Sequence, residues 1–295
     1  FRTVFDKQAT YALCEQLGVN FPQTRHCEHP RELSEQLDEL GVPVIVKPCC
    51  SVRAEAALGK DYVRLCHSEE DAEEYFSYLH QRGTPAVLQS YFNGVGVGME
   101  VLACQGRILK SLQHKRLHET TGHGSTYRQT VPRNAELFEA SAKLMQALNY
   151  TGVAMVEFRL NPRTNEWVLL EINGRFWGSL PLAVAAGADF PGHLYEMLVE
   201  DRTDFPDQYR VGVRSRALSE DIRWTWRNLR RRGRDFRNEQ PQNLGWTPTE
   251  ISHGQLLCDT LRGLLLCDCV DSFAWDDPKP ALCEAGQFLS AGLQR

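Results

Sequence analysis

Apolar residues recur through the first two hundred positions of the chain with two spacings, one typical of helices and one typical of strands. From Asp6 to Leu17 the apolar positions fall on one helical face, and Gly18 ends the segment. By the same criteria, further helices are expected at 31–40, 69–81, 135–148, 178–186 and 190–200. Strands are expected at 42–47, 62–65, 86–90, 97–104, 107–113 and 126–131. Beyond Glu200 the pattern weakens, and we expect a mostly helical C-terminal tail.

Two apolar segments rich in β-branched residues, 153–158 and 167–173, flank a turn rich in Asn, Pro and Thr. Folded as an antiparallel hairpin, they place Glu157 opposite the end of the second strand, which carries Glu171 and Asn173. Side chains alternate along a strand, so Glu171 and Asn173 project to the same side. Two carboxylates and an amide oxygen on one face repel each other unless a hard cation lies between them. Mg²⁺ accepts such oxygen ligands and completes its shell with water and phosphates.

The hairpin has a second interpretation. Acidic residues at strand ends are commonly solvated, and a Glu-x-Asn sequence carries little information by itself. The rest of the chain has to decide between a solvated strand end and a metal site.

The composition is that of an ordinary globular protein, with 42% hydrophobic and 24% charged residues among 295. The net charge of -5 and the pI near 6.0 give no reason to expect nucleic acid or an acidic membrane surface as a partner. The longest apolar stretches are too short to span a bilayer. Ten cysteines without a Cys-x-x-Cys pair, and no visible secretory signal, favour reduced thiols in a cytoplasmic protein. The chain starts at Phe1, as a fragment or a processed product would.

Six short motifs decide between the two interpretations of the hairpin. They are, in order, Asp6-Lys7 at a helix start, Val44-Ile-Val-Lys47-Pro, Val87-Leu-Gln-Ser-Tyr-Phe-Asn-Gly94, His114-Lys-Arg116, Val156-Glu157-Phe and Leu169-Leu-Glu-Ile-Asn-Gly-Arg175. In this order and spacing they resemble the ATP-grasp superfamily, the fold of carboxylate–amine ligases, biotin carboxylase and carbamoyl-phosphate synthetase. The resemblance runs from about residue 6 to 200, and it favours the metal site.

The resemblance implies an α+β fold in which two α+β lobes grip a nucleotide between antiparallel sheets. A helical segment at 1–40 would lead into a small lobe at 41–94. A large lobe with the metal site would occupy 95–200, and 201–295 would form a C-terminal extension. Relatives normally carry a further α/β domain before the Asp-Lys helix. Only a few residues precede Lys7 here, so that domain lies outside the given sequence or never existed.

Two lysines are implied as ligands of the ATP phosphates. Lys47 ends a buried strand, and the family places a lysine there on the α-phosphate side. Lys7 begins a helix, where its charge opposes the helix dipole, and a bound anion would resolve the conflict. The alternative for each is an ordinary surface lysine that is solvated or snorkels.

The segment 89–92 fits the family's hinge between the lobes, where backbone groups bind the adenine edge and apolar side chains sandwich the ring. Its members are Gln89, Ser90, Tyr91 and Phe92. The usual hinge acid is replaced by Gln89, whose amide can still accept from the adenine amine. The position at which relatives contact the ribose falls here in the repeat Gly94-Val-Gly-Val-Gly98, which has no polar side chain. Glu100 follows Gly98 by two residues, projects to the same face of the strand, and is the substitute. An ordinary buried strand is the alternative.

Three basic residues are candidates for contact with the transferring phosphoryl group. In the family a basic residue on the strand after the hinge reaches the γ-phosphate, which implicates Arg116 and His114 here. Arg175, two residues beyond Asn173, can clamp a phosphoryl group or a substrate carboxylate in bidentate fashion. For His114 and Arg116, a plain basic surface is the alternative.

The resemblance implies an ATP-dependent ligase. Mg²⁺, or Mn²⁺ in its place, would be held by Glu157, Glu171 and Asn173 against the ATP phosphates. A carboxylate would be activated as an acyl-phosphate and captured by an amine, with formation of a C–N bond. The expected partners are therefore a small-molecule carboxylate and a small-molecule amine, without nucleic acid or membrane. The sequence names neither substrate and gives no oligomeric state.

One departure from the family supports a second hypothesis. Relatives often close a glycine-rich loop over the phosphates, but the loop at 49–59 has no glycine before Gly59. Arg53 or Lys60 could supply charge instead. A poor lid would make the chain an ATP-binding regulatory or partner protein with weak or no turnover. A third hypothesis is a structural protein whose acidic residues face water.

Two further segments have weaker interpretations. The stretch Thr121–Ser125 reads as a mobile loop over the acceptor substrate. The arginine-rich run Arg227–Arg237 could bind RNA or an acidic substrate, but a solvated helix face is favoured.

Overall fold

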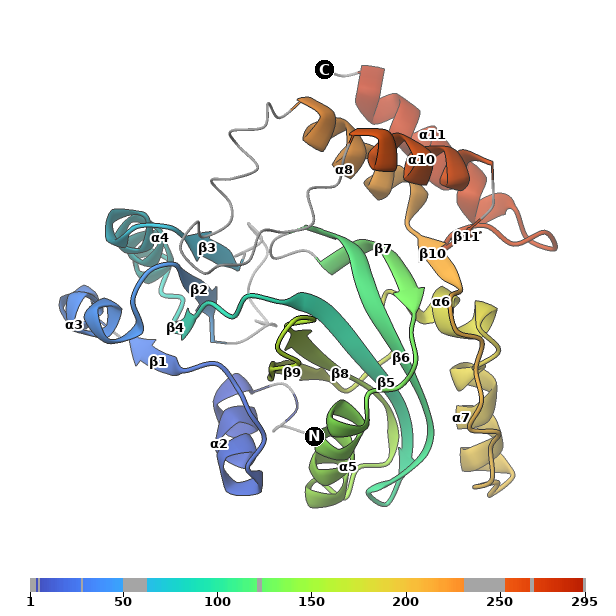
Figure 1. The fold of residues 1–295 in the computed structure, drawn as a ribbon, viewed down its shortest axis with the longest axis horizontal. Helices are drawn as coiled ribbons and strands as arrows, with labels where there is room; N and C mark the ends of the chain where they lie inside the picture. The colour runs from blue at the N-terminus through green and yellow to red at the C-terminus, as the bar shows by residue number, and fades with distance from the viewer. Residues whose placement is uncertain are drawn as a thin grey trace.

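The structure is a computed structural model, and it describes Val4 and residues 6–27, 29–49, 63–120, 124–230, 253–265 and 268–293. Two β-sheets form its centre, and helices cover them (Figure 1). Helix α2 (Lys7–Leu17) begins where the sequence predicts it, because the Asp6 carboxylate accepts from the backbone N–H groups of Gln8 and Ala9. The predicted α+β fold is confirmed.

The small sheet has four strands in the order β1-β4-β2-β3, each antiparallel to its neighbour. These are β1 (Thr24–Cys27), β2 (Val44–Pro48), β3 (Arg64–Cys66) and β4 (Ala86–Ser90). Two helices, α3 (Pro30–Leu40) and α4 (Glu69–Gln81), bury one apolar face each against the strands. Their buried positions follow helical spacing, with Leu33 and Leu37 on α3 and Phe76 and Leu79 on α4.

The large sheet has seven strands in the order β11-β10-β7-β6-β5-β8-β9. They are β5 (Val95–Cys104), β6 (Arg107–Thr120), β7 (Gly124–Thr130), β8 (Gly152–Leu160), β9 (Trp167–Asn173), β10 (Arg214–Arg216) and β11 (Cys269–Val270). Neighbours are antiparallel except β10 and β11, which are parallel. The predicted β5–β6 and β8–β9 hairpins are both present.

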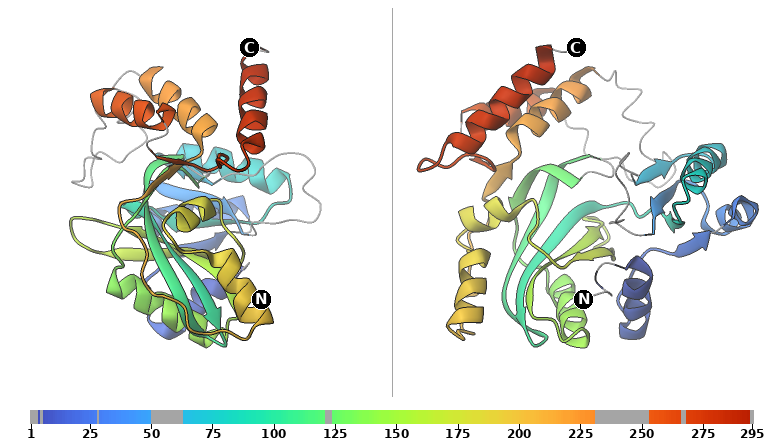
Figure 2. Two further views of the ribbon diagram at one scale, coloured as in Figure 1. Left: turned by 90° about the vertical axis from the view of Figure 1, so that its right-hand side faces the viewer. Right: turned by 180° about the vertical axis from the view of Figure 1, so that it is seen from behind.

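Helices cover both faces of the large sheet. On one face α2 and α5 (Ala135–Ala147) pack on alternate strand residues such as Val97, Met99, Val156 and Phe158. On the other face α6 (Leu180–Ala185) and α7 (Phe190–Val199) pack on Leu112 and Met155. Figures 1 and 2 show α7 beside the large sheet on the side away from the small sheet.

Within its described residues, the C-terminal part adds three helices and two strands. They are α8 (Leu218–Arg230), α10 (His253–Leu264) and α11 (Lys279–Leu293), with β10 and β11. The helices lie near the end of the large sheet that β10 and β11 form (Figures 1 and 2). The described part of the tail is mostly helical, as predicted, but its two short strands extend the large sheet itself.

Three strands were not expected from the sequence pattern. β1 reads Thr-Arg-His-Cys, which has little hydrophobic alternation, yet it pairs with β4 at the sheet edge. β10 and β11 have only three and two residues, too few for a period-two signal. β6 also continues beyond the predicted end at 113, as far as Thr120. These strands depend on partners distant in sequence, which a local pattern does not contain.

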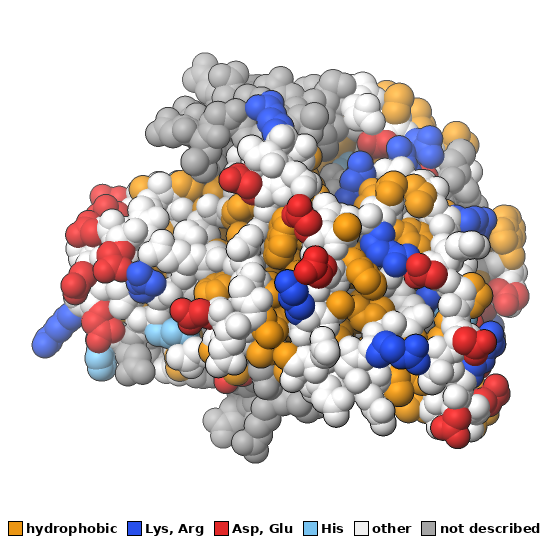
Figure 3. Space-filling view, turned by 60° about the horizontal axis from the view of Figure 1, so that its bottom comes forward, with side chains coloured by type: hydrophobic (Ala, Val, Ile, Leu, Met, Phe, Trp, Pro, Cys, Tyr) orange, Lys and Arg blue, Asp and Glu red, His pale blue; other side chains and the backbone are white. Residues whose placement is uncertain are grey.

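The surface carries mixed charge. In Figure 3 acidic side chains gather over the end of the molecule that holds the small sheet, on the left. The exposed acidic residues of its two helices include Glu35, Asp38, Glu39, Glu73 and Glu74. No described helix is both long enough and apolar enough to cross a membrane.

Candidate metal and nucleotide site

The β8–β9 hairpin brings the three predicted metal ligands together. Glu157 and Glu171 are register partners on the two strands, and Asn173 pairs with Met155 on the same side. The amide Nδ2 of Asn173 donates to Glu157 Oε1 at 3.3 Å and to Glu171 Oε1 at 3.1 Å. The predicted convergence of these side chains is therefore present, and their role as metal ligands stays a prediction.

The two carboxylates repel each other, and three neighbouring groups offset the repulsion. Arg116 Nη2 lies 2.7 Å from Glu157 Oε2, Lys7 Nζ lies 3.8 Å from Glu171 Oε2, and the Asn173 amide bridges the two. Burial raises the pKa of Glu157 above its usual range; the Arg116 guanidinium opposes this shift and the Glu171 carboxylate adds to it. Additional positive charge would therefore stabilise this pair.

The donor set fits a small divalent cation. Among the described residues, no three His, Cys, Asp or Glu side chains converge as a complete metal cage. Two carboxylates and an amide would therefore need water or phosphate oxygens to fill a shell, which is how Mg²⁺ is usually bound in phosphate-handling sites. The side chains of Glu157 and Glu171 are 13% and 35% exposed, so the pair is accessible from one side.

One row of residues crosses four strands and ends at this pair. His114 on β6 faces Gly98 on β5, Gly98 faces Glu157 on β8, and Glu157 faces Glu171 on β9. A Cβ on Gly98 would lie 2.4 Å from His114 Cε1, so the histidine ring occupies the space that a side chain would fill. A Cβ on Gly96 would likewise meet Arg116 Cδ at 2.6 Å. The glycine repeat of β5 thus makes room for the basic side chains of β6.

We expect Gly98→Ala to destabilise the protein by about 1–3 kcal/mol, because the new methyl group overpacks His114 and Met155. The matched control is Gly178→Ala, an exposed position where nothing lies within 4 Å of the added Cβ. Urea denaturation followed by circular dichroism measures both variants. Equal midpoints for Gly98→Ala and Gly178→Ala would contradict this account of the repeat.

His114, the first residue of this row, forms a buried pair with Glu100 of β5. His114 Nδ1 and Glu100 Oε1 are hydrogen-bonded, and the Glu100 side chain is only 1% exposed. Its second oxygen, Oε2, is buried without a hydrogen-bond partner. Glu100 thus offers no surface to a ribose in this conformation, and the predicted ribose contact stays untested. Its partner His114 lies near Glu157 and opposes the rise in the pKa of that carboxyl.

Lys47 is the most completely buried of the predicted phosphate ligands. The residue is 5% exposed, and its Nζ donates to Gln89 Oε1 at 2.9 Å and to the Tyr11 hydroxyl at 3.0 Å. Burial lowers the pKa of Lys47 to about 8, and the Glu171 carboxylate opposes this shift. Burial makes the charged form of Lys47 unfavourable, and the nearby Glu171 carboxylate only partly offsets this. An anionic ligand next to Lys47 would stabilise its charge further.

The predicted hinge connects the two sheets, between β4 and β5. The Gln89 side chain is buried and turned toward Lys47, with its Oε1 already accepting from that ammonium. The Ser90 N–H donates to Gln23 O. Burial raises the pKa of Tyr91, which lies near the charges of Arg159 and Glu119. Half-buried Phe92 lines an open cavity of about 570 Å³, together with Phe21 and Trp167.

Comparisons with known proteins identify this arrangement. Residues 83–220 match a family model described as ATP-grasp in the biosynthetic pathway with Ter operon. The fold is similar to the crystal structure of a biotin carboxylase β-γ-ATP complex from Campylobacter jejuni, with a TM-score of 0.58 and 16% sequence identity over 72% of this chain and 50% of that one. The chain has the ATP-grasp fold. The family resemblance predicted from the six motifs is confirmed.

Curated relatives of this ATP-grasp chain are distant. D-alanine–D-alanine ligase of Rickettsia peacockii is 27% identical over 177 residues, which are 56% of this chain and 52% of the relative. The C-terminal section of the carbamoyl phosphate synthase large chain of Methanopyrus kandleri is 20% identical over 188 residues, 60% of this chain and 33% of the relative. The chain thus spans between a third and about half of the length of these relatives.

Two arginines, Arg159 and Arg175, belong to the β8–β9 hairpin or follow it directly. The predicted Arg175 is exposed, and its Nη2 lies 3.4 Å from Asn173 Oδ1. Arg159 was not predicted; its Nη1 donates to Glu119 Oε2 at 2.6 Å and to Gly94 O at 2.8 Å. Arg159 stands two positions after Glu157 on β8, so strand alternation alone would have placed it on the same face. It pairs with the Glu119 that the Gly96 N–H also contacts.

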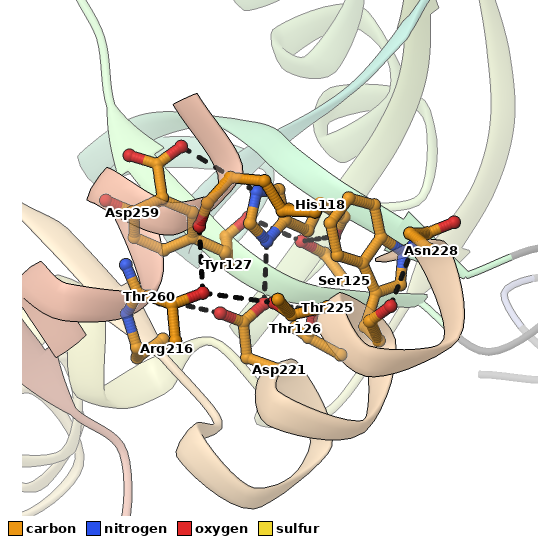
Figure 4. A network of polar contacts seen from close by, with 12 residues as sticks. His118, Ser125, Thr126, Tyr127, Arg216, Asp221, Thr225, Asn228, Asp259 and Thr260 are labelled. Carbon is orange, nitrogen blue, oxygen red and sulfur yellow. Dashed lines mark hydrogen bonds and ion pairs between the residues drawn. The ribbon is translucent and has the colours of Figure 1, made fainter. Parts of the chain in front are cut away.

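His118 lies on the same strand as His114 but belongs to a separate network (Figure 4). Its Nδ1 lies 2.7 Å from Asp221 Oδ1 of α8, and its ring stacks on Trp224 at a centroid distance of 3.9 Å. Asp221 also accepts from Arg216 Nη1 at 2.6 Å. The network therefore fixes α8 to strands β6 and β10 of the ATP-grasp sheet.

Three predictions concern residues that the structure does not fully describe. In the glycine-poor loop 49–59, only Cys49 is described, and Arg53 and Lys60 lie outside the described residues. Of the expected acceptor loop Thr121–Ser125, the described part is the start of β7. Of the arginine-rich run, 227–230 form the last turn of α8 and 231–237 are outside the described residues.

Proposed function

We propose that this ATP-grasp chain binds Mg-ATP between its two sheets and acts as an ATP-dependent ligase. The observation that carries the proposal is the convergence of Glu157, Glu171 and Asn173 next to the cations of Lys7 and Arg116. Carboxylates gathered with lysine and arginine in one place suit a ligand with its own negative charge and a metal ion. The titles of similar solved structures, which include complexes with ATP and with MgADP, support the same ligand.

Each side chain has a defined part in this proposal. Glu157, Glu171 and Asn173 would hold Mg²⁺, or Mn²⁺ in its place, whose charge would neutralise the phosphate oxygens. Lys7 of α2 and Lys47 of β2 would bind phosphate oxygens. Phosphoryl transfer needs little covalent help from a protein, so positioning and charge stabilisation would be the main contributions of these residues.

The proposed reaction joins a carboxylate to an amine. A carboxylate oxygen attacks the γ-phosphorus, ADP leaves, and an acyl-phosphate forms. An amine then attacks the acyl carbon, phosphate leaves, and a C–N bond is made. Arg116 and the exposed Arg175 would stabilise the charge on the phosphoryl group and on the tetrahedral intermediate. D-alanine–D-alanine ligase, named for joining two amino acids, supports amino acids as the first substrates to test.

An ADP-release screen with the longest natural form of the protein tests this proposal. Amino acids and small carboxylates are supplied in pairs as donors and acceptors, with Mg-ATP. Release of ADP and phosphate that depends on one pair, with a new amide found by mass spectrometry, is the expected result. Tight ATP binding without release for any pair would instead support the regulatory or partner protein, which the glycine-poor loop 49–59 favours. Failure to bind Mg-ATP would overturn both.

The affinity for Mg-ATP is expected to fall at alkaline pH. The pKa of Lys47 in the free protein is lowered to about 8, so the ammonium that binds phosphate is lost above that pH. We expect a dissociation constant that is level below pH 8 and rises about tenfold for each pH unit above it. Calorimetric titrations between pH 6.5 and 9.5 measure this. In Lys47→Met binding should be weaker and the alkaline rise absent; a wild-type constant that stays level to pH 9.5 would contradict the assignment.

A further inference from the structure

Tyr11 of α2 connects the two sheets through its hydroxyl group. The oxygen accepts from Lys47 Nζ at 3.0 Å and from Gln89 Nε2 at 2.9 Å, and the hydroxyl donates to Leu170 O at 2.9 Å. Lys47 and Gln89 belong to β2 and β4 of the small sheet, whereas Leu170 belongs to β9 of the large sheet. The hydroxyl is thus hydrogen-bonded to both halves of the proposed nucleotide site.

The direction of each bond follows from the chemistry of its partners. The Lys47 ammonium can only donate, and the Leu170 carbonyl can only accept. The Tyr11 proton must therefore point to Leu170, and both oxygen lone pairs are left for Lys47 and Gln89. Gln89 then presents Nε2 to Tyr11 and Oε1 to Lys47, as the structure has it. Burial raises the pKa of Tyr11 to about 12, so the hydroxyl keeps its proton at neutral pH.

The ring of Tyr11 is also fixed. It is buried, and it stacks on Phe21 with ring centroids 5.1 Å apart and planes within 9°. The residue after Leu170 is Glu171, one of the two carboxylates of the proposed metal site. A rigid ring therefore holds an ammonium on one sheet at a fixed place relative to a carboxylate on the other.

We propose that Tyr11 is a positioning residue, whose hydroxyl holds the Lys47 ammonium at the distance from Glu171 that the triphosphate and its metal require. This inference depends on the proposed function, because it assigns a role within the same ATP site. It does not make Tyr11 a catalytic residue, since the ring and hydroxyl are taken up by Phe21, Lys47, Gln89 and Leu170.

Removing only the hydroxyl should weaken ATP binding and change its pH dependence. Tyr11→Phe keeps the stacked ring but takes one acceptor from the buried ammonium, so Lys47 loses its proton more readily. The other groups around Lys47 are unchanged: Gln89 on β4, Glu171 on β9 and Cys49 after β2. We expect the Mg-ATP dissociation constant at pH 7.5 to rise roughly tenfold, and the alkaline rise to begin at a lower pH than in the wild type.

A matched control separates positioning from general stability. Tyr209→Phe also removes a hydroxyl that donates to a backbone carbonyl, that of Val131 at 2.6 Å, and Tyr209 is not a hydrogen-bond partner of Lys47 or Gln89. Its Mg-ATP dissociation constant and pH profile should stay within twofold of the wild type. If Tyr11→Phe and Tyr209→Phe bind ATP equally, with the same pH profile, Tyr11 does not position Lys47.

A measurement without nucleotide keeps this test independent of the proposed function. The Lys47 side chain is titrated by NMR through its ¹³Cε signal, assigned with Lys47→Met, in the wild type and in Tyr11→Phe. A lower midpoint in Tyr11→Phe supports the positioning role even if the wild type binds no Mg-ATP. Absence of Mg-ATP binding would overturn only the proposed function. An unchanged midpoint overturns the inference whatever the protein binds.

Discussion

Replacement of Glu171 by alanine is expected to lower the rate of Mg-ATP turnover by roughly a hundredfold to a thousandfold. Glu171 faces Glu157 across the hairpin and lies within 4 Å of Lys7. Its loss therefore removes one of the two carboxylates of the proposed metal site and the carboxylate that pairs with Lys7. Steady-state ADP release with varied Mg²⁺ measures the effect. Because a metal ligand is lost, the Mg²⁺ concentration for half-maximal rate should rise as well.

The fold should tolerate this replacement. The Glu171 side chain is 35% exposed, and its contacts are one ion pair at 3.8 Å and the amide of Asn173. We expect the melting temperature to stay close to that of the wild type, because partly exposed ion pairs contribute little to stability. The control variant is Glu166→Ala, an exposed carboxylate before β9 that accepts from Thr164. Equal turnover and Mg²⁺ dependence in both variants would remove Glu171 from the metal site.

Elements with local signals could be predicted well from the sequence. The helices α2, α4 and α5 are capped by Asp6, Ser68 and Asn134, whose side chains accept from backbone N–H groups of the first turn. The β8–β9 hairpin has alternating strands and a turn sequence between them, so its two carboxylates could be placed opposite each other. In each case the residues that decide the structure lie within about twenty positions of one another.

Features that depend on distant residues could not be predicted in this way. Strand β1 is specified by β4, about sixty positions later, rather than by its own hydrophobicity. The glycines of β5 are explained by side chains of neighbouring strands: Arg116 and Glu119 of β6 at Gly96, and His114 of β6 with Met155 of β8 at Gly98. Tyr11 reads as one apolar position of an amphipathic helix, and its role depends on Lys47 and Gln89 of the small sheet. Local periodicity identifies the elements and their buried faces, whereas the packing between elements determines the remaining contacts of the site.

The polar network around Asp221 also depends on residues far apart in the sequence. Of the variants considered, removal of the Asp221 carboxylate should lower the stability most. Asp221 accepts from Arg216 at 2.6 Å, His118 at 2.7 Å and Thr126 at 2.8 Å. Arg216 is 1% exposed, lies over the Tyr127 ring, and donates to Asp268 at 2.8 Å.

Burial tends to raise the pKa of Asp268, but hydrogen bonds from Arg216 and Tyr127 lower it overall. Because the pKa is lowered on folding, Asp268 contributes stability above pH of about 4 and loses it as the pH falls.

Asp221→Ala is therefore expected to destabilise the protein by about 3–5 kcal/mol, because a buried guanidinium and a buried imidazole lose a shared carboxylate. The contrasting variant is Glu39→Ala, whose 53% exposed side chain pairs with Arg25 and whose loss should cost less than about 1 kcal/mol. Thermal denaturation gives both values. Hydrogen exchange shows where Asp221→Ala acts: the amides of α8 should lose protection first, since Asp221 joins that helix to β6, β7 and β10. If the two variants melt at the same temperature and α8 keeps its protection, the network does not hold the C-terminal helices to the sheet.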